Sequence, residues 1–385
     1  MGAYHQMGHD SWNLVHEKHL HGYEGIVLSP INNAPETMAQ RILALKKKRD
    51  DLDIILDPQL YEPRSNRGQL ASWPYFSTDV DTVNLANVSW WGEKGQAIVA
   101  AAKSVGANAI CSPAMLPRIY SDDYYRWTVD CAETTSKHAS KNGIDTLITS
   151  IVRLSELAQK GRCEAIASIL TGTDISRIYL VLSDDLTPRN QRTDVESLAG
   201  AIRLIRLLED AGTEVLVSFS GLDMLLWKAA GATHVASGKF FNLRRFVPGR
   251  FEEDNQDGGR VVPYWTDAGL ITWLREDDIK LLDKNELIDR TEASSNPFSK
   301  EILEILDAGS GEAWVGYGWR QYLYWFQETE AVISSDLNAA KTILKSADAL
   351  WGKKEETGVY LFDRQNTGDW IRPWLNAIKM GLQDI

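Results

Sequence analysis

Three polar residues, each followed directly by a proline, are the first places where this chain could do chemistry. They are Ser29, Asp57 and Ser112, and each ends a short apolar run. Proline has no N–H and cannot continue a strand ladder, so it marks where a strand ends and keeps the preceding residue extended. We therefore expect the three side chains at one rim of a parallel sheet. For any one of them, the alternative is a residue that only ends a strand or caps a helix.

Three aspartates are the candidate catalytic groups. Asp57 stands in DIILDPQLY, with Gln59 and Tyr61 beside it, and Asp184 and Asp185 follow the apolar run RIYLVLS. Two carboxylates from different strands suit acid–base chemistry, because burial and mutual repulsion separate their pKa values. For Asp184 and Asp185, the alternative is that they cap the turn that leads to the next proline.

Residues 238–250, GKFFNLRRFVPGR, concentrate positive charge in an acidic chain. The segment has four basic residues and no acidic one. It leaves an apolar run that we expect to be the seventh strand of a barrel, where barrels commonly bind phosphate. Arg and Lys suit phosphate by charge and by bidentate hydrogen bonding. The predicted phosphate ligands are Lys239, Arg244, Arg245 and Arg250. The alternative is a solvated loop paired with the acidic residues that follow it.

The elements that must position these residues read as a (β/α)8 barrel. The predicted strands are residues 25–29, 53–57, 107–112, 146–152, 177–183, 214–218, 234–237 and, more weakly marked, 261–265. Nearly unbroken apolar runs fit strands buried on both faces, and polar residues at the carboxyl ends of barrel strands face the active site. An open doubly wound sheet is the structural alternative. No Gly-rich dinucleotide fingerprint follows the first run, and we expect no cofactor.

The chain divides into three parts on the same pattern. We expect an N-terminal segment at 1–23, the barrel at 24–270 with an ordered insertion at about 59–91, and a helical C-terminal extension at 271–385. The insertion is too long for an ordinary βα loop and is rich in tryptophan and other aromatic residues, so we expect it near the catalytic mouth.

Composition narrows the functional class. The 385 residues carry a net charge of −12, so any contact with nucleic acid has to come from a local basic patch. No run of about 18 apolar residues would span a membrane, and no signal peptide is apparent, so we expect a cytoplasmic protein. Five of the seven histidines stand in the first 21 residues. Their spacing permits metal ligation, but packing is the favoured explanation, and we expect no metal site.

Two stretches resemble the tRNA-guanine transglycosylase superfamily, including its DNA-acting deazaguanine branch. They are DIILDPQLYEPRS and SGLDMLLWKAAGATHVASGKFFNLRR. The resemblance implies a (β/α)8 barrel that cleaves a base–sugar N-glycosidic bond with paired aspartates. The family's DSGGF-like motif and its zinc site are missing here. The strand that carries the family's nucleophilic aspartate reads HVAS at 234–237, so water attack is the simpler chemistry.

These observations together predict a glycosylase that excises a modified base from DNA, and the resemblance suggests a role in antiviral defence. Asp57 with Asp184 or Asp185 would assist an oxocarbenium-like transition state. The predicted substrate contacts are Ser29, Gln59, Tyr61, Ser112, Ser237 and Asn242. The alternative is a lyase or aldolase acting on a phosphorylated metabolite, with Lys239 as a reactive amine. A third hypothesis is a scaffold whose Trp-rich C-terminal helices bind a partner.

Overall fold

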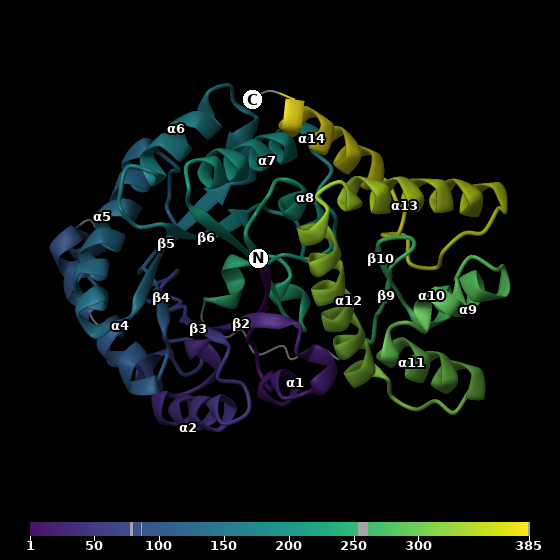
Figure 1. Ribbon diagram of the computed structural model, residues 1–385, viewed down its shortest axis with the longest axis horizontal. Coiled ribbons are helices and arrows are strands. Elements are labelled where there is room, and N and C mark those ends of the chain that lie inside the picture. Colours follow the sequence, from purple (N-terminus) through teal and green to yellow (C-terminus); the bar gives the residue numbers. More distant parts are fainter. Residues whose placement is uncertain (78–79, 86, 253–260, 384–385) are drawn as a thin grey trace.

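Eight short strands pair in parallel and close into a barrel in the computed structural model, which describes residues 1–77, 80–85, 87–252 and 261–383 (Figure 1). The strands are β1 (Gly2–Gln6), β2 (Tyr23–Leu28), β3 (Asp53–Leu56), β4 (Ala109–Cys111), β5 (Asp145–Arg153), β6 (Arg177–Ser183), β7 (Glu214–Ser218) and β8 (His234–Ser237). Nearly every strand residue is buried, as expected for a parallel sheet covered by helices. The predicted fold class is confirmed.

The identity of two strands differs from the prediction. β1 lies in the segment that was expected to precede the barrel, and it closes the sheet by pairing with β2 on one side and β8 on the other. Its sequence, GAYHQ, has no apolar run, because the barrel interior accepts polar side chains at this position. The expected strand at 261–265 is wrong: β9 (Trp265–Asp267) pairs with β10 (Thr272–Leu274) in a separate antiparallel hairpin.

Helices follow the strands in the usual alternation. They are α1 (Trp12–Val15), α2 (Pro35–Lys46), α3 (Thr82–Leu85), α4 (Val88–Val105), α5 (Asp122–Ala139), α6 (Arg162–Leu170), α7 (Val195–Asp210) and α8 (Met224–Ala229). Side-chain caps begin two of them: Asn87 accepts from Ser89 N–H, and Ser121 accepts from Tyr124 N–H. No described helix is long and apolar enough to cross a lipid bilayer.

The eighth helix of the barrel comes from the region that was expected to be an extension. α12 (Val315–Ser335) packs against β1 and α8 and fills the place beside β8 (Figure 1). The Tyr23 hydroxyl donates to the Leu323 carbonyl at 3.0 Å, and buried Lys228 pairs with Glu330 at 2.8 Å. The barrel therefore runs from residue 2 to about residue 335, and residue 271 is not its boundary.

The elements between β8 and α12 form a small subdomain beside the barrel. They are the β9–β10 hairpin, α9 (Glu276–Lys284), α10 (Arg290–Ala293) and α11 (Pro297–Ala308). After α12, α13 (Ala339–Glu356) runs beside the β9–β10 hairpin, and α14 (Ile371–Gln383) returns to pack on α7 (Figure 1). Trp374 anchors α14 by donating its indole N–H to the Arg192 carbonyl at 2.8 Å.

The described part of the 59–91 insertion packs against the loop that follows β2. Trp73 is buried and donates its indole N–H to the Asn33 carbonyl at 3.0 Å. Tyr75 and Trp91 are buried in the same apolar cluster. Residues 78, 79 and 86 of this predicted insertion lie outside the described residues.

Candidate active site

Ser29, Asp57 and Ser112 each follow the last residue of their strand by one position. β2, β3 and β4 are neighbours in parallel register, so the three residues share the carboxyl-terminal rim of the barrel. All three are almost completely buried. Their common rim agrees with the expectation from the three proline pairs.

Asp57 is enclosed and holds specific hydrogen bonds. Only 1% of the Asp57 surface is exposed. One carboxylate oxygen accepts from the Gln59 N–H at 3.0 Å, and the other accepts from the Tyr61 hydroxyl at 3.0 Å. Gln59 has a φ of 55°, a left-handed conformation that is uncommon outside glycine and that changes the direction of the chain after the N–H that binds Asp57.

The environment of Asp57 suits proton transfer near neutral pH. Burial raises the pKa of Asp57 to about 7, and the hydrogen bonds from Gln59 and Tyr61 and the charge of Arg250 oppose this only in part. A carboxyl group whose pKa lies near the working pH can serve as a general acid or a general base.

Gln59 links Asp57 to the end of β2. The Gln59 side-chain oxygen accepts from the Ser29 hydroxyl at 3.0 Å and from the Ile31 N–H at 3.1 Å. The Asn32 amide donates to the Ser29 hydroxyl at 2.7 Å. The Gln59 amide nitrogen is buried and has no hydrogen-bond partner among the described residues, so one donor remains for a ligand.

Arg250 approaches the same site from the loop after β8. It ends a short 3-10 turn, Pro248–Arg250. Among the described residues, its guanidinium makes only long hydrogen bonds: 3.5 Å to the Ser29 hydroxyl and 3.4 Å to the Asn242 side-chain oxygen. Burial lowers the pKa of Arg250 to about 10, while the Asp57 charge opposes this shift. The charge of each residue shifts the pKa of the other, although the described residues Asp57 and Arg250 form no direct ion pair.

Two residues that were not predicted complete the floor of the site. Gln6 ends β1, and Tyr179 lies in the middle of β6. The Tyr179 hydroxyl donates to the Gln6 side-chain oxygen at 3.2 Å. A hydrogen bond from Tyr179 also lowers the pKa of Asp57. The Gln6 amide nitrogen is a second buried donor without a described partner. Gln6 was missed because β1 was missed. A tyrosine inside the apolar run RIYLVLS was the available signal for Tyr179.

An aromatic cluster closes the mouth above these groups. Tyr61, Phe219, Phe246 and Phe251 are each at most 2% exposed. Tyr61 meets Phe251 at a ring-centroid distance of 4.7 Å, and Phe246 stacks on Phe251 at 5.4 Å. Tyr61 joins this cluster to Asp57, so the cluster contributes to the burial that raises the pKa of Asp57.

Asp184 and Asp185 are not brought together with Asp57. Asp184 pairs with Arg192 at 2.6 Å and with Arg245 at 3.4 Å. Burial works against ionisation of Asp184, but these two guanidinium groups hold its pKa below the usual value. Asp185 has a side chain that is 81% exposed and pairs with Arg153. Neither is placed as a second acid beside Asp57.

The basic residues of 238–250 turn inward rather than form a surface patch. Arg244 donates to the carbonyls of Gly238 and Lys239 and stacks on Tyr322, with its guanidinium carbon 3.4 Å from the ring centroid. Arg245 is 2% exposed and faces Asp184. These contacts attach the loop to the barrel and to α12. Of the four predicted phosphate ligands, only Arg250 lies with Asp57.

Lys239 lies in a separate, largely aromatic environment. Its ammonium is 4.3 Å from the Trp319 ring centroid and 4.8 Å from that of Phe240, and burial lowers its pKa. Its charge acts on His5 of β1. A lowered pKa is what a reactive amine needs. Among the described contacts, however, none connects Lys239 with Asp57.

Two predicted substrate contacts are already engaged within the protein. The Ser112 hydroxyl accepts from the Thr149 N–H at 3.0 Å, which ties β4 to β5. The Ser237 hydroxyl donates to the Ser220 carbonyl and meets the Tyr322 hydroxyl, both at 2.5 Å. Within the described parts of the chain, no group of three or more His, Cys, Asp or Glu side chains is arranged to hold a metal ion.

Comparisons with known proteins add little to this geometry. No family model and no curated protein matches the sequence. Similar solved structures include dihydrodipicolinate synthases from Oceanobacillus iheyensis, covering 96% of this chain and 94% of that one, and from Bacillus clausii, covering 98% and 97%. An L-ribulose 3-epimerase covers 93% and 98%. Identity is 11% in each case, and the TM-scores are 0.36, 0.36 and 0.35. Scores this low support no inference about activity, and the transglycosylase resemblance stays a prediction.

Proposed function

We propose that the chain is a barrel enzyme that moves a proton on a small organic anion at the carboxyl ends of its strands. Asp57 is the general acid–base group. Arg250 holds the carboxylate or phosphate of the substrate, and Gln59 and Gln6 donate to its oxygen atoms. This is the small-molecule alternative, with Asp57 rather than Lys239 at the centre of the chemistry.

The observation that carries the proposal is a buried acid with a pKa near neutral beside an arginine that makes only two long hydrogen bonds among the described residues. Asp57 has a pKa of about 7 in a water-poor site, and Arg250 lies near it without a direct ion pair. The Arg250 Nε is buried and has no described hydrogen-bond partner. An anionic substrate between the two groups would satisfy Arg250 by bidentate hydrogen bonding and bring a C–H or O–H bond to Asp57.

Base excision from DNA has less support. A DNA strand needs exposed cations for its phosphates, whereas Lys239, Arg244 and Arg245 are at most 4% exposed. A second carboxylate beside Asp57 would also be expected for a glycosidic bond, and Asp184 is paired with two arginines. The direct check is alkali-induced strand breakage after incubation with DNA that carries modified bases.

The test of the proposal is proton exchange with solvent. A panel of 2-oxo acids, hydroxy acids and sugar phosphates is incubated with the protein in D2O, and deuterium incorporation is followed by NMR. We expect exchange with at least one compound, lost in Asp57→Asn and kept in Asp185→Asn, which alters an exposed carboxylate. Absence of exchange across the panel, or full exchange in Asp57→Asn, would contradict the proposal.

A further inference from the structure

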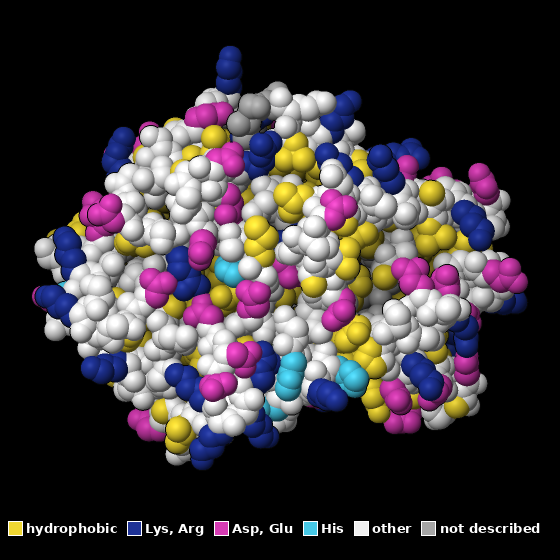
Figure 2. Space-filling model, viewed as in Figure 1, with side chains coloured by type: hydrophobic (Ala, Val, Ile, Leu, Met, Phe, Trp, Pro, Cys, Tyr) yellow, Lys and Arg dark blue, Asp and Glu magenta, His cyan; other side chains and the backbone are white. Residues whose placement is uncertain are grey.

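A cavity lies outside the barrel, in the C-terminal subdomain. Its volume is about 430 Å³, within the range of small-molecule sites. The β9–β10 hairpin, α10, α11, α12 and α13 enclose it. Figure 2 shows a hollow beside α12, walled by hydrophobic side chains with acidic groups around its rim. None of its lining residues belongs to the site around Asp57.

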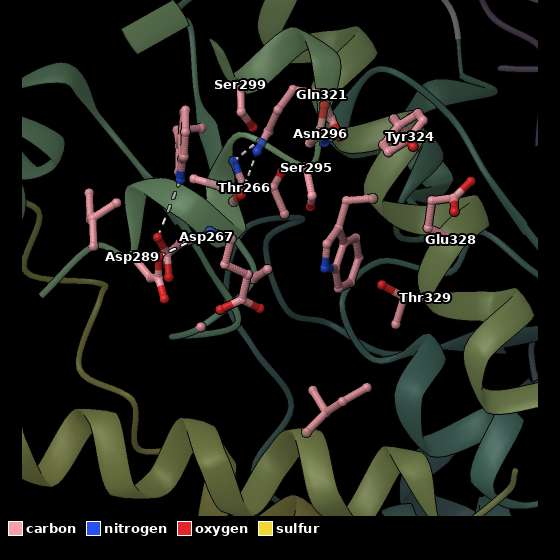
Figure 3. A pocket seen from close by; sticks show the side chains of 18 of the residues that line it. Thr266, Asp267, Asp289, Ser295, Asn296, Ser299, Gln321, Tyr324, Glu328 and Thr329 are labelled. Carbon is pink, nitrogen blue, oxygen red and sulfur yellow. Dashed lines mark hydrogen bonds between the residues drawn. The ribbon is translucent and has the colours of Figure 1, made fainter. Parts of the chain in front are cut away.

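The walls of the cavity are mainly apolar and aromatic. A ligand with an apolar body would contact Trp265, Leu287, Ile288, Trp325, Ile343 and Leu350. In Figure 3, Asp267 and Asp289 lie on one side of the cavity, and Tyr324, Glu328 and Thr329 lie on the other. Burial of an apolar body against these walls would provide most of the binding free energy.

The charge of the lining has one sign. The four ionisable acids are Asp267, Asp289, Glu292 and Glu328, and no Lys, Arg or His occurs among the described residues that line the cavity. Glu292 forms no ion pair with any described residue. Burial raises the pKa of Asp267, and the charge of Glu292 raises it further, as expected where negative charge is not compensated.

One buried polar group beside the cavity has no described partner. The Thr266 hydroxyl is buried, in a residue that is 2% exposed, and has no described hydrogen-bond partner. Thr266 lines the cavity, while its backbone is held by Gln321, which donates to the Thr266 carbonyl at 2.6 Å and accepts from its N–H at 2.8 Å. A buried hydroxyl left unpaired costs stability, so this wall of the cavity is polar as well as apolar.

We propose that this cavity binds an organic cation, specifically an amine carried on an apolar or aromatic body. The rim carboxylates attract the ammonium, and the aromatic faces of Trp325 and Tyr324 add cation–π stabilisation. An anionic ligand would meet only like charge. A divalent metal ion is not favoured, because these acids do not form one of the ligand groups that a metal requires.

The experiment compares three molecules of similar shape and different charge by isothermal titration calorimetry with the full chain. Tryptamine is the cation, tryptophol is the neutral analogue and indolepropionate is the anion. We expect tryptamine to bind at one site at least 10-fold more tightly than tryptophol, and indolepropionate to bind more weakly than both. Equal affinity of the three, or tighter binding of the anion, would overturn the proposal.

Variants locate the binding. The double variant Glu292→Gln with Glu328→Gln changes two exposed side chains and should weaken tryptamine at least 10-fold while leaving tryptophol unchanged. Ala293→Trp, on α10, should fill the cavity and abolish binding of both. Glu312→Gln removes an exposed acid outside the cavity and serves as the matched control. Unchanged tryptamine affinity in folded Ala293→Trp, checked by circular dichroism, would place the binding elsewhere and refute the proposed site.

Discussion

The mouth of the barrel and the C-terminal cavity both combine aromatic and ionisable side chains, but they differ in burial and in charge. At the mouth, a buried aromatic cluster borders Asp57, whose pKa is raised. Arg250 lies near Asp57 without a direct ion pair to it among the described residues. The cavity has a volume of about 430 Å³, and its described lining residues are mainly apolar, with four acids and no cation. Burial at the mouth raises the pKa of Asp57, whereas the cavity offers a ligand space that already exists. Asp57 lies outside the cavity, whereas Asp267, whose pKa is also raised by burial, lines it.

α12 presents one face to the barrel and another face to the cavity. Tyr322 points to the barrel, where it meets Ser237 and stacks under Arg244, whereas Gln321 and Trp325 line the cavity. α12 lines the cavity and packs on the barrel, but none of its residues belongs to the site around Asp57. Each of the following predictions tests one region or the separation between them.

The largest expected effect is loss of proton exchange in Asp57→Asn. The amide cannot accept a proton at neutral pH, and general acid–base contributions reach about 10⁴-fold. We expect a rate loss approaching that size, measured by deuterium incorporation in D2O. Tryptamine binding to the cavity should be unchanged, and a parallel loss of binding would mean that the variant had damaged the fold.

Asp57 should also make stability depend on pH. Its pKa in the folded protein is about 7, above that of an unfolded chain, so the protonated side chain favours the folded state at low pH. This stabilisation is fully present below about pH 4 and is lost as pH rises through 7, up to about 4 kcal/mol in all.

Urea unfolding at pH 5 and pH 8 measures this effect. Wild type should lose more stability between the two values than Asp57→Asn, which cannot ionise. Identical pH dependence in the two proteins would show that Asp57 has an ordinary pKa, and the mouth would then lose its distinction from the open cavity.

Removal of Arg250 should have a smaller effect on exchange than removal of Asp57. Arg250→Met deletes the positive charge that partly lowers the pKa of Asp57, so the pH midpoint of activity should move upward from about 7. The KM for the anionic substrate should rise by about 10-fold or more, since a charged hydrogen bond contributes about 1.5–3 kcal/mol. Arg250→Lys should restore the pH midpoint more fully than the KM, because lysine keeps the charge without the bidentate geometry.

The smallest expected effect is that of Tyr322→Phe. This change removes a hydroxyl that meets the Ser237 hydroxyl at 2.5 Å and costs about 1 kcal/mol of folding stability. Thermal unfolding measures that loss. Tryptamine affinity should stay within twofold of wild type, and a larger change would show that α12 transmits the state of one region to the other.

Part of the site could be predicted from local sequence. Asp57, Gln59 and Tyr61 interact within five residues, so their contacts depend on one turn after β3. The three proline pairs marked one rim because parallel strands end together. The alternation of apolar runs and amphipathic segments was enough to identify the barrel class.

The rest depended on contacts between distant segments. β1 forms a strand because it pairs with β2 on one side and with β8 on the other. The sequence GAYHQ has no apolar run that would predict this strand. α12 became the eighth barrel helix through packing across about 300 residues of sequence separation, seen in the bond from Tyr23 to Leu323.

The basic segment shows the same division between sequence and structure most clearly. Its composition alone determined that several positive charges would lie together after β8. The tertiary structure decided their uses: Arg244 stacks on Tyr322, Arg245 faces Asp184, and Arg250 reaches the neighbourhood of Asp57. The physical reason is that charge is a property of a residue, whereas desolvation and pairing depend on which distant groups surround it.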